Sequence, residues 1–174
     1  LWAYQNFEPK DIALTCEFGN TSSLLLSIAK QFQEKLDVYF IDTRYHFAET
    51  EQFVAELTDI YNLNVIRLVA DQSENDIISE LGNPPYQNTN ACCYAHKIKP
   101  LKKILETKKL WITGVQSYQT NNRSDMKILE LTEQKVLKLN PLLDFGREET
   151  QIYMEINGLK MYQDFSPLLK SQKK

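Results

Sequence analysis

The stretch "DVYFIDTRYHFAETEQFVAEL", residues 37–57, passes from an apolar run to a helical pattern within a few positions. Residues 38–41 are a continuous apolar run of the kind that forms a fully buried strand. Asp42 and Thr43 end that run, and apolar residues then recur at helical spacing from Phe53 onward. A buried strand followed at once by an amphipathic helix is the repeating unit of a parallel α/β sheet.

The same pattern stands on both sides of this stretch. Before it, "DIALTC" (11–16) predicts a strand and "TSSLLLSIAKQFQEKL" (21–36) a helix; after it, "NVIRLVA" (64–70) predicts a strand, with a helix over 73–81. Three successive βα units predict an α/β fold, doubly wound, with a mainly parallel sheet and helices on both faces. Ligands of such sheets bind beyond the carboxyl ends of the strands, so the polar pair that ends the opening strand is expected beside a ligand. The alternative is that this pair caps the following helix.

The second half of the chain supplies the remaining elements. Its patterns predict, in chain order, a site loop (82–93), a helix (99–106), a buried strand (110–114), a hairpin (127–142) and a closing helix (148–158). Gly158 is placed to cap the last helix. Residues 1–174 are therefore expected to form a single domain.

Composition and charge narrow the class of partner. The chain has 174 residues, 43% of them hydrophobic, and a net charge of −3. This composition is typical of a globular protein and gives no general attraction to nucleic acid or to an anionic membrane. No apolar run is long enough to span a bilayer, and the first residues lack the pattern of a signal peptide. A cytoplasmic protein with a small-molecule partner is expected, and a homo-oligomer is left open.

Two features carry chemistry. The loop "TCEFGNTSS" (15–23) lies between the first strand and its helix, where free backbone N–H groups can bind an anion, although a plain turn is the alternative. Of three cysteines, two are adjacent, at Cys92 and Cys93. Neighbouring cysteines pair poorly with each other, so they are interpreted as reduced thiols or ligands, or as inert core residues.

Five segments occur in one order at familiar separations: "TCEFGNTSSLLL", "FIDTRYHFAET", "ACCYAHKIKPL", "WITGVQSYQTNNR" and "KLNPLLDF". Together they resemble the adenylylsulfate and phosphoadenylylsulfate reductase family of sulfate assimilation. The resemblance covers about residues 11–158, leaving 159–174 as a divergent tail, and it implies an adenine nucleotide α-hydrolase-like fold.

The resemblance also implies a set of nucleotide-binding residues. Glu17, Phe18, Gly19 and Asn20 fall in the loop that faces the phosphate or sulfate end of the nucleotide. Further positions are implied to border the nucleoside or the anion: Asp42, Thr43, Lys97, Thr113, Gly114, Gln119 and Arg123. The segment "KLNPLLDF", which contains Lys138, is interpreted as mostly structural.

The chain departs from the family at several of these positions. Glu17 stands where serine is usual, Ser22 where an acidic residue is, and Arg44 where glycine is. Gln116 and Ser117 replace a pair of arginines. A carboxylate repels phosphate oxygens, and each lost charge-assisted contact is worth about 1.5–3 kcal/mol. We therefore expect weaker binding of a doubly charged ligand.

The adjacent cysteines and the missing nucleophile leave two functional alternatives, a reductase and a non-catalytic binding protein. In the adenylylsulfate-specific branch, the positions of Cys92 and Cys93 supply two thiolates to a 4Fe-4S cluster, which normally takes four. Only Cys16 remains in this chain, and the family's C-terminal Glu-Cys-Gly nucleophile is absent. The leading hypothesis is a sulfonucleotide reductase of sulfate assimilation and cysteine biosynthesis, reduced by thioredoxin or glutaredoxin, with cysteines supplied elsewhere. The alternative is a diverged, non-catalytic nucleotide-binding or partner-binding protein.

Overall fold

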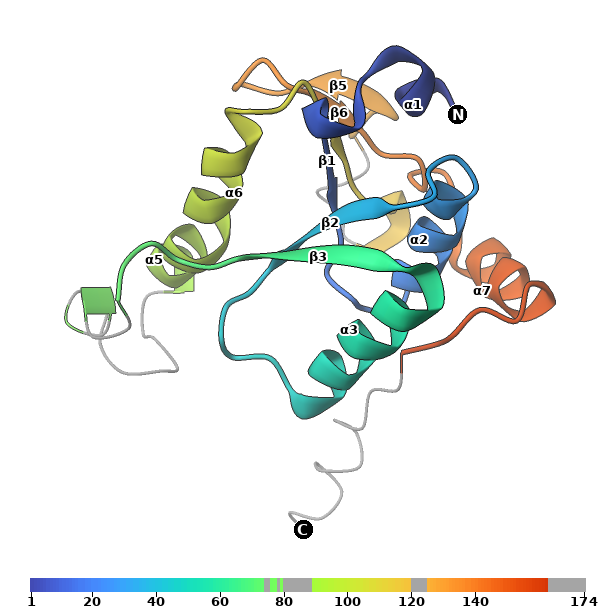
Figure 1. The fold of residues 1–174 in the computed structure, drawn as a ribbon, viewed down its shortest axis with the longest axis horizontal. Coiled ribbons are helices and arrows are strands. Elements are labelled where there is room, and N and C mark those ends of the chain that lie inside the picture. The colour runs from blue at the N-terminus through green and yellow to red at the C-terminus, as the bar shows by residue number, and fades with distance from the viewer. Residues whose placement is uncertain (74–75, 78, 80–88, 120–124, 163–174) are drawn as a thin grey trace, which may run out of the picture.

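A six-stranded sheet forms the centre of the protein, seen in a computed structural model (Figure 1). The structure describes residues 1–73, 76–77, 79, 89–119 and 125–162. The strand order is β3-β2-β1-β4-β6-β5. The strands are β1 (Ile12–Thr15), β2 (Leu36–Ile41), β3 (Leu63–Leu68), β4 (Leu110–Ile112), β5 (Leu129–Leu131) and β6 (Leu137–Leu139).

All neighbouring strands run parallel except β5 and β6, which pair antiparallel. Consecutive strands are added on one side of β1 up to β3, and the chain then crosses back so that β4 pairs with the other side of β1. The direction of winding reverses between β1 and β4, which makes this the switch point where doubly wound sheets bind ligands. The predicted fold class is confirmed.

Helices cover both faces of the sheet. In Figure 1, α2 (Ser22–Lys30), α3 (Ala48–Tyr61) and α7 (Arg147–Ile156) lie on one side, and α5 (Thr89–Cys93) and α6 (Lys99–Leu105) on the other. The short α1 (Trp2–Asn6) precedes β1. Among the described residues, no helix is long and apolar enough to cross a membrane.

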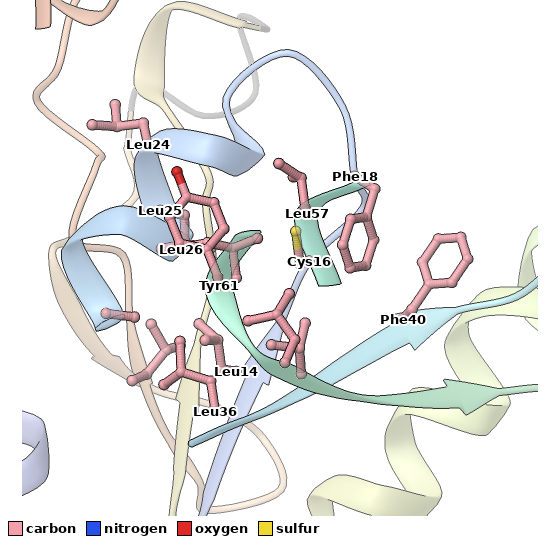
Figure 2. Close-up of a cluster of buried hydrophobic side chains, with 14 of the residues drawn as sticks. Leu14, Cys16, Phe18, Leu24, Leu25, Leu26, Leu36, Phe40, Leu57 and Tyr61 are labelled. Atoms are coloured by element: carbon pink, nitrogen blue, oxygen red, sulfur yellow. The ribbon is translucent and has the colours of Figure 1, made fainter. Parts of the chain in front are cut away.

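The hydrophobic core has a larger and a smaller part, one on each face. The larger cluster joins the apolar stripes of α2, α3 and α7 to the sheet, and Figure 2 shows Leu24, Leu26, Leu57 and Phe40 among its members. The smaller cluster packs Leu105 of α6 against residues of β1 and β2. Burial of both faces explains why the central strands β1 and β4 and most of β2 read as continuous apolar runs.

Two predicted boundaries differ from the structure. The helix expected over 21–36 ends at Lys30, because Leu36 begins β2, and Phe32 is left 39% exposed. The expected loop over 82–93 gives way to helix α5 at its end, which continues through a π-helical turn, Tyr94–Ile98, into α6. Most of that loop and part of the helix expected over 73–81 lie outside the described residues.

The hairpin and the closing helix formed as predicted. Strands β5 and β6 pair around the turn at 132–136, where the Thr132 N–H donates to the Val136 carbonyl. Helix α7 ends in a left-handed Gly158 (φ 57°), whose N–H donates to Glu155, while the Leu159 N–H donates to Met154. This double hydrogen bond is the Schellman motif that a glycine after a helix predicts.

Candidate functional site

A cavity of about 430 Å³ lies at the carboxyl ends of β1 and β4, the switch point of the sheet. Its walls come from the loop after β1, the start of α2, the segment after β4, and the turn that leads into α6. Several residues that the sequence implied for the nucleotide site line it: Glu17, Gly19, Asn20, Lys97, Thr113, Gly114 and Gln119. Their role in binding stays a prediction, but the fold brings them to one place.

Other predicted site residues do not line this cavity. Phe18 is completely buried beneath the loop and packs edge-on against Phe40, with the ring centroids 5.2 Å apart. Asp42 and Thr43 lie at the end of β2 and do not line the cavity. Cys92 and Cys93 lie on α5 and do not line it either. Arg123 falls outside the described residues.

The loop from Cys16 to Thr21 leads into the N-terminus of α2. The Ser22 N–H donates to the Gly19 carbonyl at 3.1 Å, and the Leu25 N–H to the Thr21 carbonyl at 3.2 Å, which closes the first turn. The first turn of α2 carries no acidic side chain. A Cβ at Gly19 would meet no atom within 4 Å. The positive end of the helix dipole is therefore open toward the cavity.

Cys16 forms part of the cavity floor and also belongs to the main core (Figure 2). Burial raises the pKa of its thiol to about 11, against the opposing effect of hydrogen bonds with Ser22 and the Phe18 backbone. The Glu17 carboxylate also contributes to raising this pKa. A thiol with this pKa remains protonated at neutral pH, so Cys16 is a poor nucleophile.

The segment after β4 holds the opposite wall in place. The Thr113 hydroxyl donates to Asn140 Oδ1 at 2.6 Å, and Asn140 in turn donates to the Lys127 carbonyl. A Cβ at Gly114 would lie 3.3 Å from Leu25 Cδ2, so this glycine permits a close approach between the end of β4 and α2. These contacts fix the distance between the two sides of the cavity.

Trp111 and Lys138 line the cavity although the sequence did not single them out for binding. They are register partners on β4 and β6, and Lys138 Nζ lies 5.2 Å from the centre of the indole ring. The indole N–H donates to Thr15 Oγ1 at 2.8 Å, and Lys138 forms an ion pair with Glu130 at 2.9 Å. That ion pair lowers the pKa of Glu130. Their juxtaposition depends on the pairing of β4 with β6, which local patterns do not specify.

Gln116 is fully buried and outside the cavity lining. Its amide nitrogen donates to Thr150 Oγ1 at 2.7 Å and to the Phe145 carbonyl at 3.3 Å. Its carbonyl oxygen accepts from the Tyr118 hydroxyl and the Gln119 amide, both at 3.2 Å. The glutamine therefore joins the segment after β4 to α7 and supports the cavity-lining Gln119.

Asp42 lies in an ion network with Arg67 on β3. Arg67 donates to Asp42 at 2.8 Å and to Glu51 at 2.5 Å, and Asp42 also accepts from the Arg44 N–H at 2.8 Å. Burial raises the pKa of Asp42, but the Arg67 hydrogen bond and nearby positive charges outweigh it and lower the pKa overall. The Arg67 hydrogen bond also lowers the pKa of Glu51. The carboxylate that ends β2 is thus used to tie β2, β3 and α3 together, and it does not cap α3.

The adjacent cysteines lie at the end of α5, directly before the turn that reaches the cavity. Cys92 is partly buried and Cys93 exposed, and the π-helical turn that follows carries Lys97 to the cavity wall. Burial and the neighbouring Cys93 raise the pKa of Cys92, while Lys97 opposes the shift. Within the described residues, no group of three or more His, Cys, Asp or Glu side chains could hold a metal ion. These residues alone do not complete the ligand set of a four-iron cluster.

Comparisons with known proteins agree with this architecture. Residues 11–164 match the phosphoadenosine phosphosulfate reductase domain family. The adenosine 5′-phosphosulfate reductase of Staphylococcus epidermidis is 31% identical over 161 residues, covering 91% of this chain and 66% of that protein. The enzyme of the same name from Oceanobacillus iheyensis is 29% identical over 161 residues, covering 91% of this chain and 67% of that protein. The chain thus spans about two thirds of the length of these curated relatives.

Solved structures support the fold at lower identity. The phosphoadenylyl-sulfate reductase of Candida auris, crystallised as a phosphate complex, superposes with a TM-score of 0.75 at 21% identity, covering 99% of this chain and 82% of that one. The FMN adenylyltransferase of Candida glabrata gives a TM-score of 0.64 at 16% identity, covering 91% of this chain and 52% of that one. At these identities, the structural likeness concerns the fold alone.

Proposed function

The chain belongs to the phosphoadenosine phosphosulfate reductase family, and we propose that it binds an adenine sulfonucleotide in the cavity at the ends of β1 and β4. The observation that carries the proposal is the convergence of three separate family segments on one cavity. The segments that contain Gly19, Lys97 and Gly114 are far apart in the sequence, yet each contributes residues to the same walls. These residues are Glu17, Gly19 and Asn20 of the first segment, Lys97 of the second, and Thr113, Gly114 and Gln119 of the third.

The physical character of the cavity supports a nucleotide ligand. A volume of about 430 Å³ falls within the range of small-molecule sites. The N-terminus of α2 offers the positive end of its dipole to a phosphate or sulfate, and no side-chain cap occupies it. Trp111 presents an aromatic surface, and the hydroxyl-bearing Thr15, Thr21 and Ser22 add polar groups to the lining.

For the whole protein, we propose the role of a sulfonucleotide reductase in sulfate assimilation, reduced by thioredoxin or glutaredoxin. The relatives with which the chain aligns over about two thirds of their length carry the name adenosine 5′-phosphosulfate reductase. The high pKa and burial of Cys16 argue against it as the attacking thiolate. Because Cys92 and Cys93 do not line the cavity, we propose that the nucleophile comes from outside the described residues. An iron–sulfur cluster at Cys92 and Cys93 stays a prediction that requires further ligands.

One observation favours a second candidate, a nucleotide-binding protein without reductase activity. The resemblance implies an arginine at position 116, but the amide of Gln116 is bound entirely within the protein. A glutamine held in this way offers no positive charge to a sulfate. Binding with no turnover would distinguish this candidate from the reductase.

Calorimetric titration with adenosine 5′-phosphosulfate and with AMP tests nucleotide binding directly. Wild-type protein is expected to bind both, and Lys97→Ala is expected to weaken binding about tenfold through loss of a cation at the cavity wall. Lys99→Ala removes an exposed lysine outside the lining and serves as the matched control. Absence of binding by wild-type protein, or equal losses in the two variants, would contradict the proposal. Sulfite release with reduced thioredoxin then separates the reductase from the non-catalytic binder.

A further inference from the structure

We propose that two copies of this chain join through β5, which pairs antiparallel with β5 of the second copy about a two-fold axis at Glu130. Strand β5 is an edge of the sheet, because its neighbour in the strand order is β6 on one side and no described strand lies on the other (Figure 1). The joint makes one continuous sheet of the two. The proposal does not depend on the nucleotide site.

The outer edge of β5 presents the backbone groups of alternate residues. At the two ends of the strand, the Ile128 carbonyl and the Thr132 N–H form hydrogen bonds of 2.7 Å and 2.9 Å with residues that flank β6. Since backbone groups alternate in direction along an antiparallel strand, the N–H and C=O groups of Leu129 and Leu131 point away from β6. Within the described part of the chain, these groups have no hydrogen-bond partner on that outer side.

The side chains at the same two positions are apolar and exposed. Leu131 is 65% exposed and Leu129 is 40% exposed, and both lie on the face of β5 opposite to Glu130. A two-fold axis at Glu130 sets Leu129 of each copy across from Leu131 of the other, so the leucines of both copies pack together. An open edge with exposed apolar side chains is a template for pairing with another strand.

The charges along β5 complement their own copy in this arrangement. At the axis, Glu130 faces Glu130 of the second copy, but each carboxylate already forms an ion pair of 2.9 Å with Lys138 of its own chain. Lys127 and Glu133 are exposed and equally spaced from Glu130 in the sequence, so each approaches its opposite charge across the joint. A parallel arrangement would set Lys127 against Lys127 and Glu133 against Glu133.

Sedimentation equilibrium of the protein tests the joint. The expected result is a monomer–dimer equilibrium with a Kd on the order of 10–100 µM, because so short a strand gives a small interface. Leu131→Lys should weaken the dimer at least about tenfold by placing a charge on the edge. Leu131→Pro should do the same, since it removes an N–H that β6 does not use. Ile156→Lys on α7, at a side chain that is 79% exposed, is the matched control and should leave the Kd unchanged.

Disulfide trapping tests the register, in protein that also carries Cys92→Ser and Cys93→Ser. Glu130→Cys places two thiols opposite each other across the axis and should give a cross-linked dimer on mild oxidation. Leu129→Cys lies across from Leu131 of the other copy and should not cross-link to itself. A protein that stays monomeric at about 1 mM would overturn the proposal. A dimer that Leu131→Lys and Ile156→Lys weaken equally would overturn it as well, and so would trapping through Leu129→Cys but not through Glu130→Cys.

Discussion

At the scale of single residues, Arg44 and Phe18 adopt backbone conformations that residues of their types do not favour. Arg44 has φ 64° and Phe18 has φ 50°, both in the left-handed region that costs a residue with a Cβ about 1 kcal/mol or more. The resemblance to the family implies a glycine at position 44, and a positive φ is a conformation that glycine adopts without steric cost. Both residues lie in strand-to-helix connections, where the chain must turn sharply.

Arg44→Gly is expected to stabilise the protein. Its side chain is exposed, and the backbone hydrogen bond to Asp42 is kept in the variant. Relief of the left-handed strain should raise the free energy of unfolding by about 0.5–1 kcal/mol, after the greater entropy of glycine in the unfolded chain is subtracted. Urea unfolding measures the change. Arg44→Ala keeps the strain and should show little gain; a stabilisation of equal size in both variants would refute this explanation.

The three cysteines are expected to differ widely in reactivity. Cys93 is exposed, Cys92 is partly buried with a raised pKa, and burial raises the pKa of Cys16 to about 11. Because the thiolate is the reactive form, iodoacetamide at neutral pH should label Cys93 first, Cys92 later, and Cys16 only on unfolding. Peptide mass spectrometry over time gives the order. Rapid labelling of Cys16 in folded protein would show that the cavity floor is more open than the structure has it.

At the scale of secondary structure elements, Arg67 connects three of them. From β3 it contacts Asp42 at the end of β2 and Glu51 in the first turn of α3, and its guanidinium lies 5.2 Å from the centre of the Phe40 ring. The side chains of Arg67 and Glu51 are 39% and 42% exposed, so solvent screens this pair, whereas that of Asp42 is 13% exposed. The network holds the β2–α3 connection against the sheet.

Arg67→Met should make the protein less stable in a pH-dependent way. The lowered pKa values of Asp42 and Glu51 contribute stability that is present above their unfolded values of about 4 and is lost as pH falls through the folded values. We expect a loss of about 1–2 kcal/mol at pH 7 and a much smaller loss near pH 3, where the carboxylates are becoming protonated. Urea unfolding at both pH values measures the difference.

Lys103→Met is the control for that experiment. It breaks an ion pair with Asp71 whose side chains are 68% and 53% exposed, and it should change stability by less than about 0.5 kcal/mol. If Arg67→Met cost the same at pH 7 and pH 3, the loss would come from packing on Phe40 and not from the ion network.

At the scale of the whole molecule, the cavity exists because strands distant in the sequence are neighbours. The loop after β1 leads to α2, β4 and the segment after it contribute Trp111, Thr113 and Gly114, and β6 contributes Lys138. The close approach of Gly114 to Leu25 sets the width between these walls. A ligand that contacts several of these segments should stabilise the entire fold by mass action.

Saturating AMP is therefore expected to raise the Tm. At about 100 times its Kd, a ligand adds about 2.7 kcal/mol, which corresponds to roughly 5–10 °C for a domain of this size. Gly114→Val should lose this shift, because its side chain would enter the space held by Leu25 and narrow the cavity. Scanning fluorimetry with and without AMP measures both effects.

Gly158→Ala is the matched control, because it is destabilising without touching the cavity. It forces a Cβ into a left-handed cap and should cost about 1 kcal/mol, while the shift caused by AMP remains. Loss of the shift in this variant as well would mean that reduced stability, and not the shape of the cavity, explains the result for Gly114→Val.

Much of the fold could be predicted because buried strands leave a local record. β1, β2 and β4 read as apolar runs, and Gly158 marked the end of α7. The predicted end of α2 was wrong because Phe32 and Leu36 continue the apolar spacing of the helix, although Leu36 belongs to β2. Of the candidate site, the loop around Gly19 and the Thr113-Gly114 pair could be recognised from motifs that follow strand ends.

The sequence by itself determined the α/β class, the succession of strands and helices, and the family, since these depend on periodicity and motifs within short stretches. Only the tertiary structure decided which side chains meet. It places Lys138 over the Trp111 ring and in an ion pair with Glu130. It also pairs Asp42 with Arg67 and buries Gln116 in a hydrogen bond with Thr150. The physical reason is that strand order and register choose partners across the sheet, and burial then decides which charges remain available to a ligand.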